Sequence, residues 1–213
     1  MSTKTRIEWT ECTWNVLLGC RRISKGCEKC YAINAIHRMA GNPNPKIATA
    51  NRGLTVRHPN GQLDWTGDVR VLPERLEQPL HWKRPRRIFV NSLSDFFHED
   101  VPTASIDQML EVMAACPQHC FQILTKRPEN IHAKLYGHAV DDPLWGTTDG
   151  HRIRELGGGD YLANVWLGVS VEDQKTANRR IPEVLHVEGG WVRWVSAEPL
   201  QEAVDLCRWL GGW

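Results

Sequence analysis

Short apolar and β-branched runs alternate along this chain with amphipathic stretches. Four runs have the length and composition of buried strands, and a fifth is a weaker candidate: residues 87–90, 121–125, 165–171 and 192–199, with 14–20 as the fifth. Between them, apolar residues recur at helical spacing in three places: 106–113 behind Pro102, 131–135 behind Pro128, and 172–185. This order predicts a parallel sheet covered by helices.

Two architectures fit that order, a doubly wound sheet and a complete or partial barrel. We predict an α/β fold in which parallel strands form a partial (βα) barrel with outer helices. Residues 41–68 and 137–160 are rich in Gly, Pro, Asn and Asp without clear periodicity, so both are expected to be long excursions. A chain of 213 residues and 24.3 kDa fits one domain, here residues 1–213, with its own buried core.

A polar segment follows each predicted strand. In chain order these segments are "GCRRISKGC", "NSLSDFFHED", "TKRP", "SVED" and "SAEP". The carboxyl ends of the strands carry the functional site in parallel α/β architectures. We therefore expect the five segments to converge on one mouth.

Composition limits the partners and the compartment. Lys and Arg total 26 against 25 Asp and Glu, so a formal charge of +1 provides no global field for a polyanion, and any grip on nucleic acid must be local. The first residues lack a secretory apolar core, and nowhere do about 18 apolar residues run together, which predicts a cytoplasmic protein without a membrane span. In a reducing compartment, seven cysteines indicate core thiols, metal ligands or catalytic groups rather than disulfides.

Three cysteines cluster in "GCRRISKGCEKCYA", residues 19–32. Cys20, Cys27 and Cys30 have the spacing C-x6-C-x2-C, in which the two-residue gap lets neighbouring thiolates reach one metal centre. Three ligands on a 4Fe-4S cluster leave one iron open to a non-protein ligand. The alternatives are a closed zinc tetrahedron completed by His37 or Cys12, an iron–sulfur centre with Cys12 as its fourth ligand, and ordinary thiols in a turn.

The other cysteines and the basic run carry weaker signals. Cys116 and Cys120 precede a predicted strand and are expected to pack at its amino end, whereas Cys207 in the tail carries no signal. A continuous strand over 14–20 would place Cys12 some 20 Å from Cys20, too far for a shared cluster. The run "HWKRPRR" leads into residues 87–90, so we interpret it as a solvated edge away from the mouth.

Several long motifs together resemble a known family. They are "IEWTECTWN", "GCRRISKGCEKCYA", "RIFVNSLSDFFHEDVP", "FQILTKRPENI", "VWLGVSVEDQKTANRRIP" and "RWVSAEPL". Over nearly the whole chain they resemble a phage-associated family of uncharacterised proteins with a three-cysteine motif. That family in turn resembles radical S-adenosylmethionine (SAM) enzymes, particularly the spore photoproduct lyase branch. The usual triad there is C-x3-C-x2-C, so the longer first gap here implies a bulged loop.

The resemblance implies a function. A 4Fe-4S cluster on the three cysteines would chelate SAM, and reduction would cleave SAM to a 5′-deoxyadenosyl radical for hydrogen abstraction. It also implies an electron donor such as flavodoxin or ferredoxin, the cytoplasm of a bacterial host, and phage-related modification or repair of a base in DNA or a nucleotide.

The resemblance further assigns site residues. Lys126 matches the lysine that pairs with the SAM carboxylate, and Ser92, Ser94 and Asp95 lie where the SAM ammonium is accepted, Asp95 foremost because of its charge. Ser170 and Glu172 lie where contacts to the ribose or the amino-acid part of SAM are expected. Glu198 is expected to face the substrate, and Tyr31 to pack on the cluster or the adenine. Helix caps, rim charges and core filling are the structural alternatives.

Two competing hypotheses remain at this point. The first is a zinc-stabilised, non-catalytic nucleic-acid-binding protein, suggested by the near-complete ligand set and the basic run. The second is a catalytically inactive relative, suggested by the short segment after "SAEPL".

Overall fold

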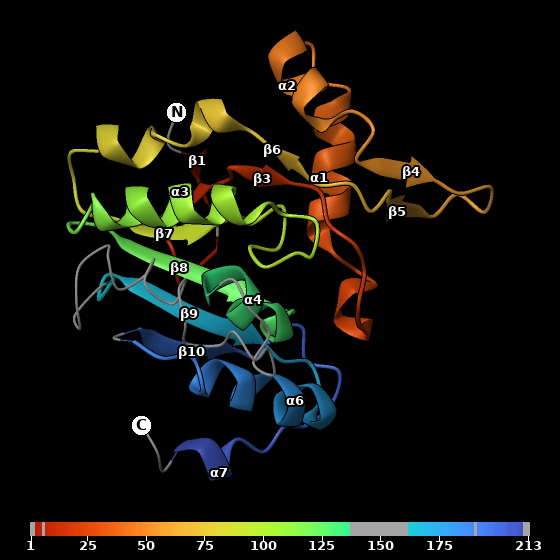
Figure 1. The fold of residues 1–213 in the computed structure, drawn as a ribbon. Coiled ribbons are helices and arrows are strands. Elements are labelled where there is room, and N and C mark those ends of the chain that lie inside the picture. The colour runs from red at the N-terminus through yellow and green to blue at the C-terminus, as the bar shows by residue number, and fades with distance from the viewer. Residues whose placement is uncertain (1–2, 6, 137–161, 190, 211–213) are drawn as a thin grey trace.

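The computed structural model describes residues 3–5, 7–136, 162–189 and 191–210 (Figure 1). The excursion predicted at 137–160 lies outside these residues. No helix in the described part of the chain has the length and apolar character needed to cross a membrane.

A six-stranded sheet forms the centre of the molecule, in the order β1-β2-β7-β8-β9-β10. Its strands are β1 (Thr3–Lys4), β2 (Cys12–Trp14), β7 (Arg87–Val90), β8 (Cys120–Thr125), β9 (Val165–Ser170) and β10 (Val192–Ser196). The five strands from β2 to β10 run parallel, and β1 pairs antiparallel with β2. The α/β class and four of the five predicted strands are thereby confirmed.

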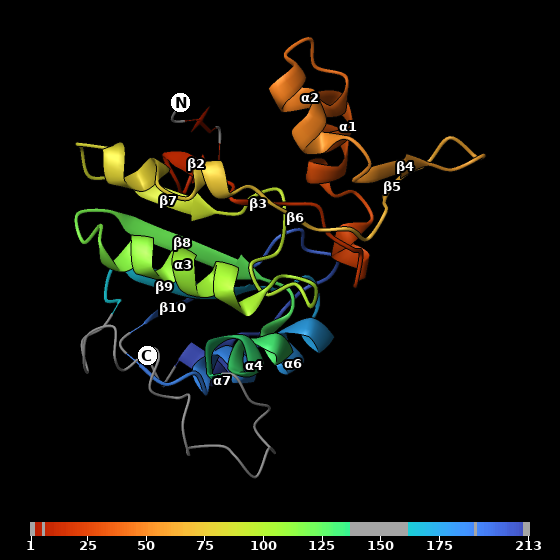
Figure 2. The same cartoon turned by 45° about the horizontal axis from the view of Figure 1, so that its top comes forward.

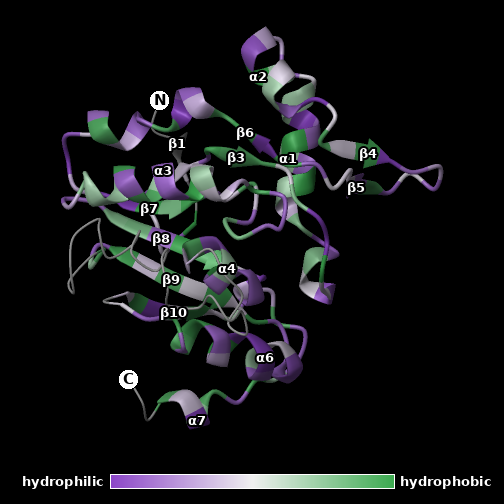
Figure 3. Ribbon diagram, in the orientation of Figure 1, coloured by the Kyte–Doolittle hydropathy of each residue, from purple (hydrophilic) through white to green (hydrophobic). Residues whose placement is uncertain are grey.

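Three helices cover one face of this sheet, as Figures 1 and 2 show: α3 (Thr103–Ala114), α4 (Ile131–Tyr136) and α6 (Gln174–Leu185). Their apolar residues pack on strand residues of that face in one buried cluster, which includes Ile106, Phe121 and Ile181. β7 is coloured hydrophobic for most of its length in Figure 3, as expected of a strand buried on both faces. The described residues also include four short helical turns and a helix near the C-terminus: η1 (Lys25–Cys27), η2 (Pro73–Arg75), η3 (Gln78–His81), η4 (Pro128–Asn130) and α7 (Cys207–Leu210).

The opposite face of the sheet carries aromatic side chains. Trp9 packs between Phe89 and Trp194, with ring centroids 4.7 and 5.0 Å away, and its carbonyl accepts a hydrogen bond from the Gln122 amide. Trp194 lies directly over Gly168, where an added Cβ would be 2.4 Å from the indole nitrogen. Side chains of the sheet and its N-terminal segment therefore fill this face.

The strand predicted at 14–20 is wrong as a single element. β2 ends at Trp14, and Leu17–Leu18 form β3, which pairs with β6 (Arg70–Val71) in a separate two-stranded sheet. Two asparagines cause the break: the Asn15 side chain accepts a hydrogen bond from the Leu93 backbone, and the Asn91 side chain accepts one from the Leu17 backbone. These local bonds replace the ladder that a continuous strand would need.

The excursion predicted at 41–68 is ordered. Residues 21–72, which we call the basic lobe, carry α1 (Tyr31–Ala40), α2 (Pro45–Asn51) and a hairpin of β4 (Thr55–Arg57) and β5 (Leu63–Trp65), and they project beside the sheet in Figure 2. A second apolar cluster, which includes Ile36, Leu54 and Trp65, holds them together. The hydrophobic periodicity of the sequence did not reveal these helices and strands, because each is too short to show a repeat.

Candidate metal centre at the carboxyl edge of the sheet

The three clustered cysteines lie on one loop that begins at the carboxyl edge of the sheet. Gly19 forms a parallel bridge with Ser94, just beyond β7, and Cys20 follows it. Cys27 ends η1 and Cys30 caps the amino end of α1, where its backbone N–H donates to the Cys27 carbonyl at 3.3 Å. All three side chains are partly buried.

Arg127, directly after β8, holds the first of these cysteines. Its guanidinium donates to Cys20 Sγ at 3.6 Å and to the Arg21 carbonyl at 2.9 Å, and it is balanced by Asp95 and Glu99 at 3.2 and 2.9 Å. Burial raises the pKa of Cys20 to about 12 even though Arg127 acts to lower it. Burial also raises the pKa of Cys30. Both thiols are therefore neutral at pH 7 unless a metal ion replaces the proton.

Glu172, just beyond β9, holds the middle of the loop. Its fully buried carboxylate accepts hydrogen bonds from the Ser24 hydroxyl at 2.5 Å and the Gly26 backbone N–H at 2.7 Å. It also pairs with Lys126 at 3.0 Å and with the buried Arg180 of α6 at 2.9 Å. Burial acts to raise the pKa of Glu172, but these four donors together outweigh burial and lower that pKa to about 2.

Asp95 is saturated in a similar way at the end of β7. Its carboxylate accepts hydrogen bonds from the Thr125 hydroxyl at 2.6 Å, from the backbone N–H groups of Phe97 and Lys126, both at 3.0 Å, and from Arg127 at 3.2 Å. These contacts join the ends of β7 and β8. Its role toward the SAM ammonium stays a prediction.

Lys126 and Ser170 lie together at the next strand ends. Lys126 Nζ donates to Ser170 Oγ at 2.7 Å, and Ser170 Oγ donates to the Glu198 carbonyl at 2.8 Å. The Lys126 side chain is 21% exposed, so it reaches the surface beside the cysteine loop. The Glu198 side chain is exposed. Polar segments after β7, β8 and β9 thus contact the cysteine loop, as expected from the strand order, and the segment after β10 contacts Ser170 and Glu172 beside it.

Tyr31 and the serines after β7 form the other side of the mouth. The ring of Tyr31 is 56% exposed beside Cys30, and its hydroxyl donates to the Ser92 carbonyl at 2.7 Å. Ser92 Oγ donates to the Asn15 side chain at 3.1 Å. Ser94 Oγ is buried and has no hydrogen-bond partner among the described residues.

The ligands suggested for zinc do not meet. Thiolates on one zinc ion lie about 3.8 Å apart, since each Zn–S bond is about 2.3 Å. Within the described residues, the three cysteines belong to no set of ligand atoms within 4.8 Å of one another. His37 is exposed two turns along α1 from Cys30, roughly 10 Å away, and its ring contacts Thr55. Cys12 is buried in the main core with its Sγ beside the Arg87 carbonyl, at the far end of the strands from Cys20.

Among the described residues, His98, Glu99 and Asp100 form a compact set of atoms of the kind that bind metals. His98 Nδ1 already accepts a hydrogen bond from the Asp100 backbone at 3.2 Å, and burial lowers the pKa of His98. Glu99 and Asp100 pair with Arg21, and Glu99 also pairs with Arg127. Protein cations occupy these carboxylates, so the set is not a metal site.

The remaining predicted positions agree with the structure. Cys116 is buried in the main core, and Cys120 begins β8 at the amino end of the sheet. Cys207 is exposed at the start of α7.

Sequence reasoning missed three arginines that organise the site: Arg22, Arg127 and Arg180. Arg127 has a sequence signal, because it is the second cation in the strand-end run "TKRP". Arg180 and Arg22 have none, since an arginine in a polar helix or loop is usually solvated.

Comparison with known families assigns the chain to one of them. A family model described as "Protein of unknown function (DUF5131)" matches residues 4–212, so the chain belongs to that family. No curated protein and no solved structure matches the chain.

Proposed function

We propose that this chain is a radical SAM-like iron–sulfur enzyme, with Cys20, Cys27 and Cys30 as the protein ligands of a 4Fe-4S cluster. When bound and reduced, such a cluster would supply the electron that splits SAM into methionine and a 5′-deoxyadenosyl radical, and that radical would take a hydrogen atom from a substrate. The observation that carries the proposal is the placement of these three thiols on one loop, held at the carboxyl edge of a parallel sheet by Arg127 and Glu172.

The donor set fits this group better than a zinc ion. Cys12 is buried in the main core, and the ring of His37 contacts Thr55 two turns along α1 from Cys30. A fourth protein ligand is therefore missing among these two candidates, which supports three protein ligands and one open position.

The chain's own residues supply position and charge. Glu172 and Arg127 hold the cysteine loop against the ends of β9 and β8, and Asp95 fixes Arg127. Lys126 is the partly exposed cation at the mouth and suits a carboxylate such as that of SAM. Ser94, with its unpartnered hydroxyl, suits the polar end of the same ligand.

We also propose that the sheet is the wall of a partial barrel. Support comes from α3, α4 and α6 lying on one face, whereas Trp9 and Trp194 pack on the other. A doubly wound sheet would carry helices on both faces.

Metal analysis of anaerobically purified protein tests the function. We expect a brown protein with about four irons that cleaves SAM when reduced and supplied with an electron donor such as flavodoxin. A colourless protein with one zinc would contradict the proposal and favour the non-catalytic zinc protein. An iron-containing protein without SAM cleavage would favour the inactive relative.

A panel of single cysteine variants makes the test specific. Cys20→Ala, Cys27→Ala and Cys30→Ala are each expected to abolish the intact cluster. The matched controls Cys12→Ala, Cys116→Ala and Cys120→Ala remove thiols from the core or the amino edge and are expected to retain iron and SAM cleavage. Loss of the cluster in Cys12→Ala would make Cys12 a fourth ligand and remove the open iron that the proposal requires.

A further inference from the structure

The chain's charge is strongly divided between two regions. The basic lobe, residues 21–72, contains nine Lys and Arg against three Asp and Glu, a formal charge of +6. The whole chain carries only +1, so the remaining residues carry −5. A near-neutral total therefore conceals a local field of the kind that binds polyanions.

Most of the lobe's cations are exposed and have no acidic partner. Arg21 pairs with Glu99 and Asp100, and Arg22 pairs with Asp64. Six further cations of the lobe are exposed, and within the part of the chain that the structure describes they form no ion pair with an acidic side chain: Lys25, Lys29, Arg38, Lys46, Arg52 and Arg57. Unpaired exposed cations gathered on one lobe are a feature of surfaces that neutralise phosphates.

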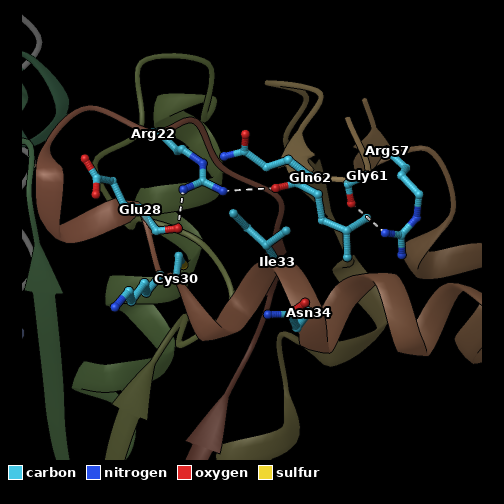
Figure 4. Close-up of a pocket in the computed structure, with 10 residues that line it drawn as sticks. Arg22, Glu28, Cys30, Ile33, Asn34, Arg57, Gly61 and Gln62 are labelled. Carbon is cyan, nitrogen blue, oxygen red and sulfur yellow. Dashed lines mark hydrogen bonds between the residues drawn. The ribbon is translucent and has the colours of Figure 1, made fainter. Parts of the chain in front are cut away.

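A pocket of about 340 Å³ lies within this lobe, between α1 and the β4–β5 hairpin (Figure 4). Arg22 builds it by joining the two sides: its guanidinium donates to the Cys27 carbonyl at 2.7 Å and to the Leu63 carbonyl at 3.0 Å, and pairs with Asp64 at 2.6 Å. Lys29 and Arg57 also line the pocket. The proposed cluster ligand Cys30 is a lining residue too, so the pocket is next to the candidate centre.

Apart from Glu28, whose carboxylate lies on the rim, the lining matches the parts of a nucleotide. Cationic Lys29 and Arg57 suit phosphate, the amides of Asn34 and Gln62 suit the hydrogen-bonding edge of a base, and Ile33 with Leu63 gives an apolar surface for the base or sugar. Exposed Tyr31, beside Cys30, offers a face on which a base stacks. The volume is at the small end for ligand pockets, roughly 300–1,000 Å³, which fits one nucleotide.

We propose that the basic lobe is a docking surface for a single-stranded polynucleotide, whose phosphates cross Lys29 and Arg57 and one of whose nucleotides enters the pocket beside Cys30. The inference deepens the proposed function and rests on it for the substrate's role, because it identifies the class of molecule that reaches the centre. A single strand is favoured over a duplex because its bases are free to enter a pocket and stack.

Binding of fluorescent oligonucleotides tests the docking surface. Anisotropy would be measured with the full chain, purified anaerobically, against single-stranded DNA and RNA of about 15 nucleotides over a range of salt concentrations. The double variant Lys29→Glu/Arg57→Glu is expected to lose at least tenfold in affinity. The milder Lys29→Ala/Arg57→Ala should reduce the slope of log K against log salt by about 1.4, since each single-strand phosphate contact contributes about 0.7.

The matched control makes the same charge change elsewhere. Lys83→Glu/Arg84→Glu alters two exposed cations that precede β7 at the amino edge of the sheet, and it is expected to change affinity less than twofold. Equal losses in both double variants would overturn the proposal, as would tighter binding of a poly-glutamate peptide or of vesicles with anionic lipid. Circular dichroism of each variant confirms that the fold is retained, and the alanine pair keeps the test open if the glutamate pair unfolds.

This experiment separates the surface from the chemistry. Binding is measured without SAM or reductant, so oligonucleotide binding by a protein that fails to cleave SAM would refute only the proposed function. SAM cleavage by a protein that binds no oligonucleotide would refute only the docking surface.

Discussion

At the scale of single residues, the site depends on buried charged groups that already have partners inside the protein. Through one carboxylate, Glu172 contacts the cysteine loop, Lys126 just after β8, and Arg180 of α6. It links strand ends to the loop that carries the thiols. Removing its charge would leave the buried Arg180 without its partner.

Glu172→Gln is expected to lower the free energy of unfolding at pH 7 by about 3 kcal/mol. The figure follows from the carboxylate pKa, which is about 2 in the folded protein and 4.5 for an ordinary Glu. Because the folded-state pKa is depressed, this stabilisation is present above about pH 4.5 and is lost as the pH falls toward 2. The difference in the free energy of unfolding between wild type and variant should therefore decrease as the pH falls from 4.5 toward 2. Urea unfolding from pH 7 to pH 3 measures it, with Glu129→Gln, at an exposed position, as the control.

Gly26→Ala is expected to destabilise the protein by about 1–3 kcal/mol, because an added Cβ would be 2.5 Å from the Glu172 carboxyl carbon. The loop must shift away from Glu172, so iron content should fall as well. Thermal unfolding and iron analysis measure both effects. Gly41→Ala is the matched control, since its Cβ would approach nothing closer than 3.7 Å, and an equal loss there would contradict the argument.

Sequence reasoning found the residue types of the site better than their partners. Lys126, Asp95 and Glu172 could be located because each follows a predicted strand, and the three thiols because of their spacing. The sequence did not predict the partners of the two carboxylates, which are Arg127 for Asp95 and Gly26 for Glu172. Those partners are set by loop conformation, which leaves no periodic signal in the sequence.

At the scale of elements, the strands were predictable because they are buried on both faces and thus continuously apolar. β7 and β9 agree with the prediction to within a residue. The exception is 14–20, where two asparagine side chains take over backbone hydrogen bonds. A side chain that substitutes for a ladder partner is invisible to hydrophobic patterning.

The packing of β10 on β9 gives a prediction at this scale. Gly168→Ala is expected to cost about 1–3 kcal/mol, because the new Cβ would lie 2.4 Å from the Trp194 indole nitrogen. The cost should shrink by more than half in a Trp194→Leu background, where the indole is absent. A double-mutant cycle by urea unfolding measures the coupling, and additive effects would show that the two strands do not pack in this way.

At the scale of the whole molecule, most buried apolar residues of the basic lobe form a cluster of their own, which Leu18 joins, whereas Val69 and Val71 at the end of the lobe pack against the main cluster. Residues 41–68 of the lobe were predicted as a long excursion, because the helix and strands in them are too short to show a periodic pattern. Its order comes from residues distant in sequence, such as Ile36 and Trp65, which pack together. Tertiary burial of that kind cannot be inferred from a local window.

The separate clusters predict that the lobe opens without the sheet. Ile36→Ala, at a fully buried position, is expected to cost about 2–5 kcal/mol and to speed hydrogen exchange in α1, α2 and the hairpin, while β8 and β9 stay protected. Ile106→Ala, in the main cluster, should instead lower protection throughout the sheet. Exchange followed by mass spectrometry distinguishes the two, and equal deprotection by both variants would indicate one cooperative unit.

Within the described part of the chain, the division of charge gives an electric dipole whose positive end lies on the basic lobe, since residues 21–72 carry +6 and the other described residues carry 14 Lys and Arg against 17 Asp and Glu, a charge of −3. In the field of a polyanion, the protein experiences a torque before contact. This torque turns the basic lobe toward the polyanion, while the acidic residues are repelled from it. Encounters would then begin in an orientation that presents the cysteine loop. The benefit appears in the association rate, which should fall steeply with ionic strength while the dissociation rate changes less.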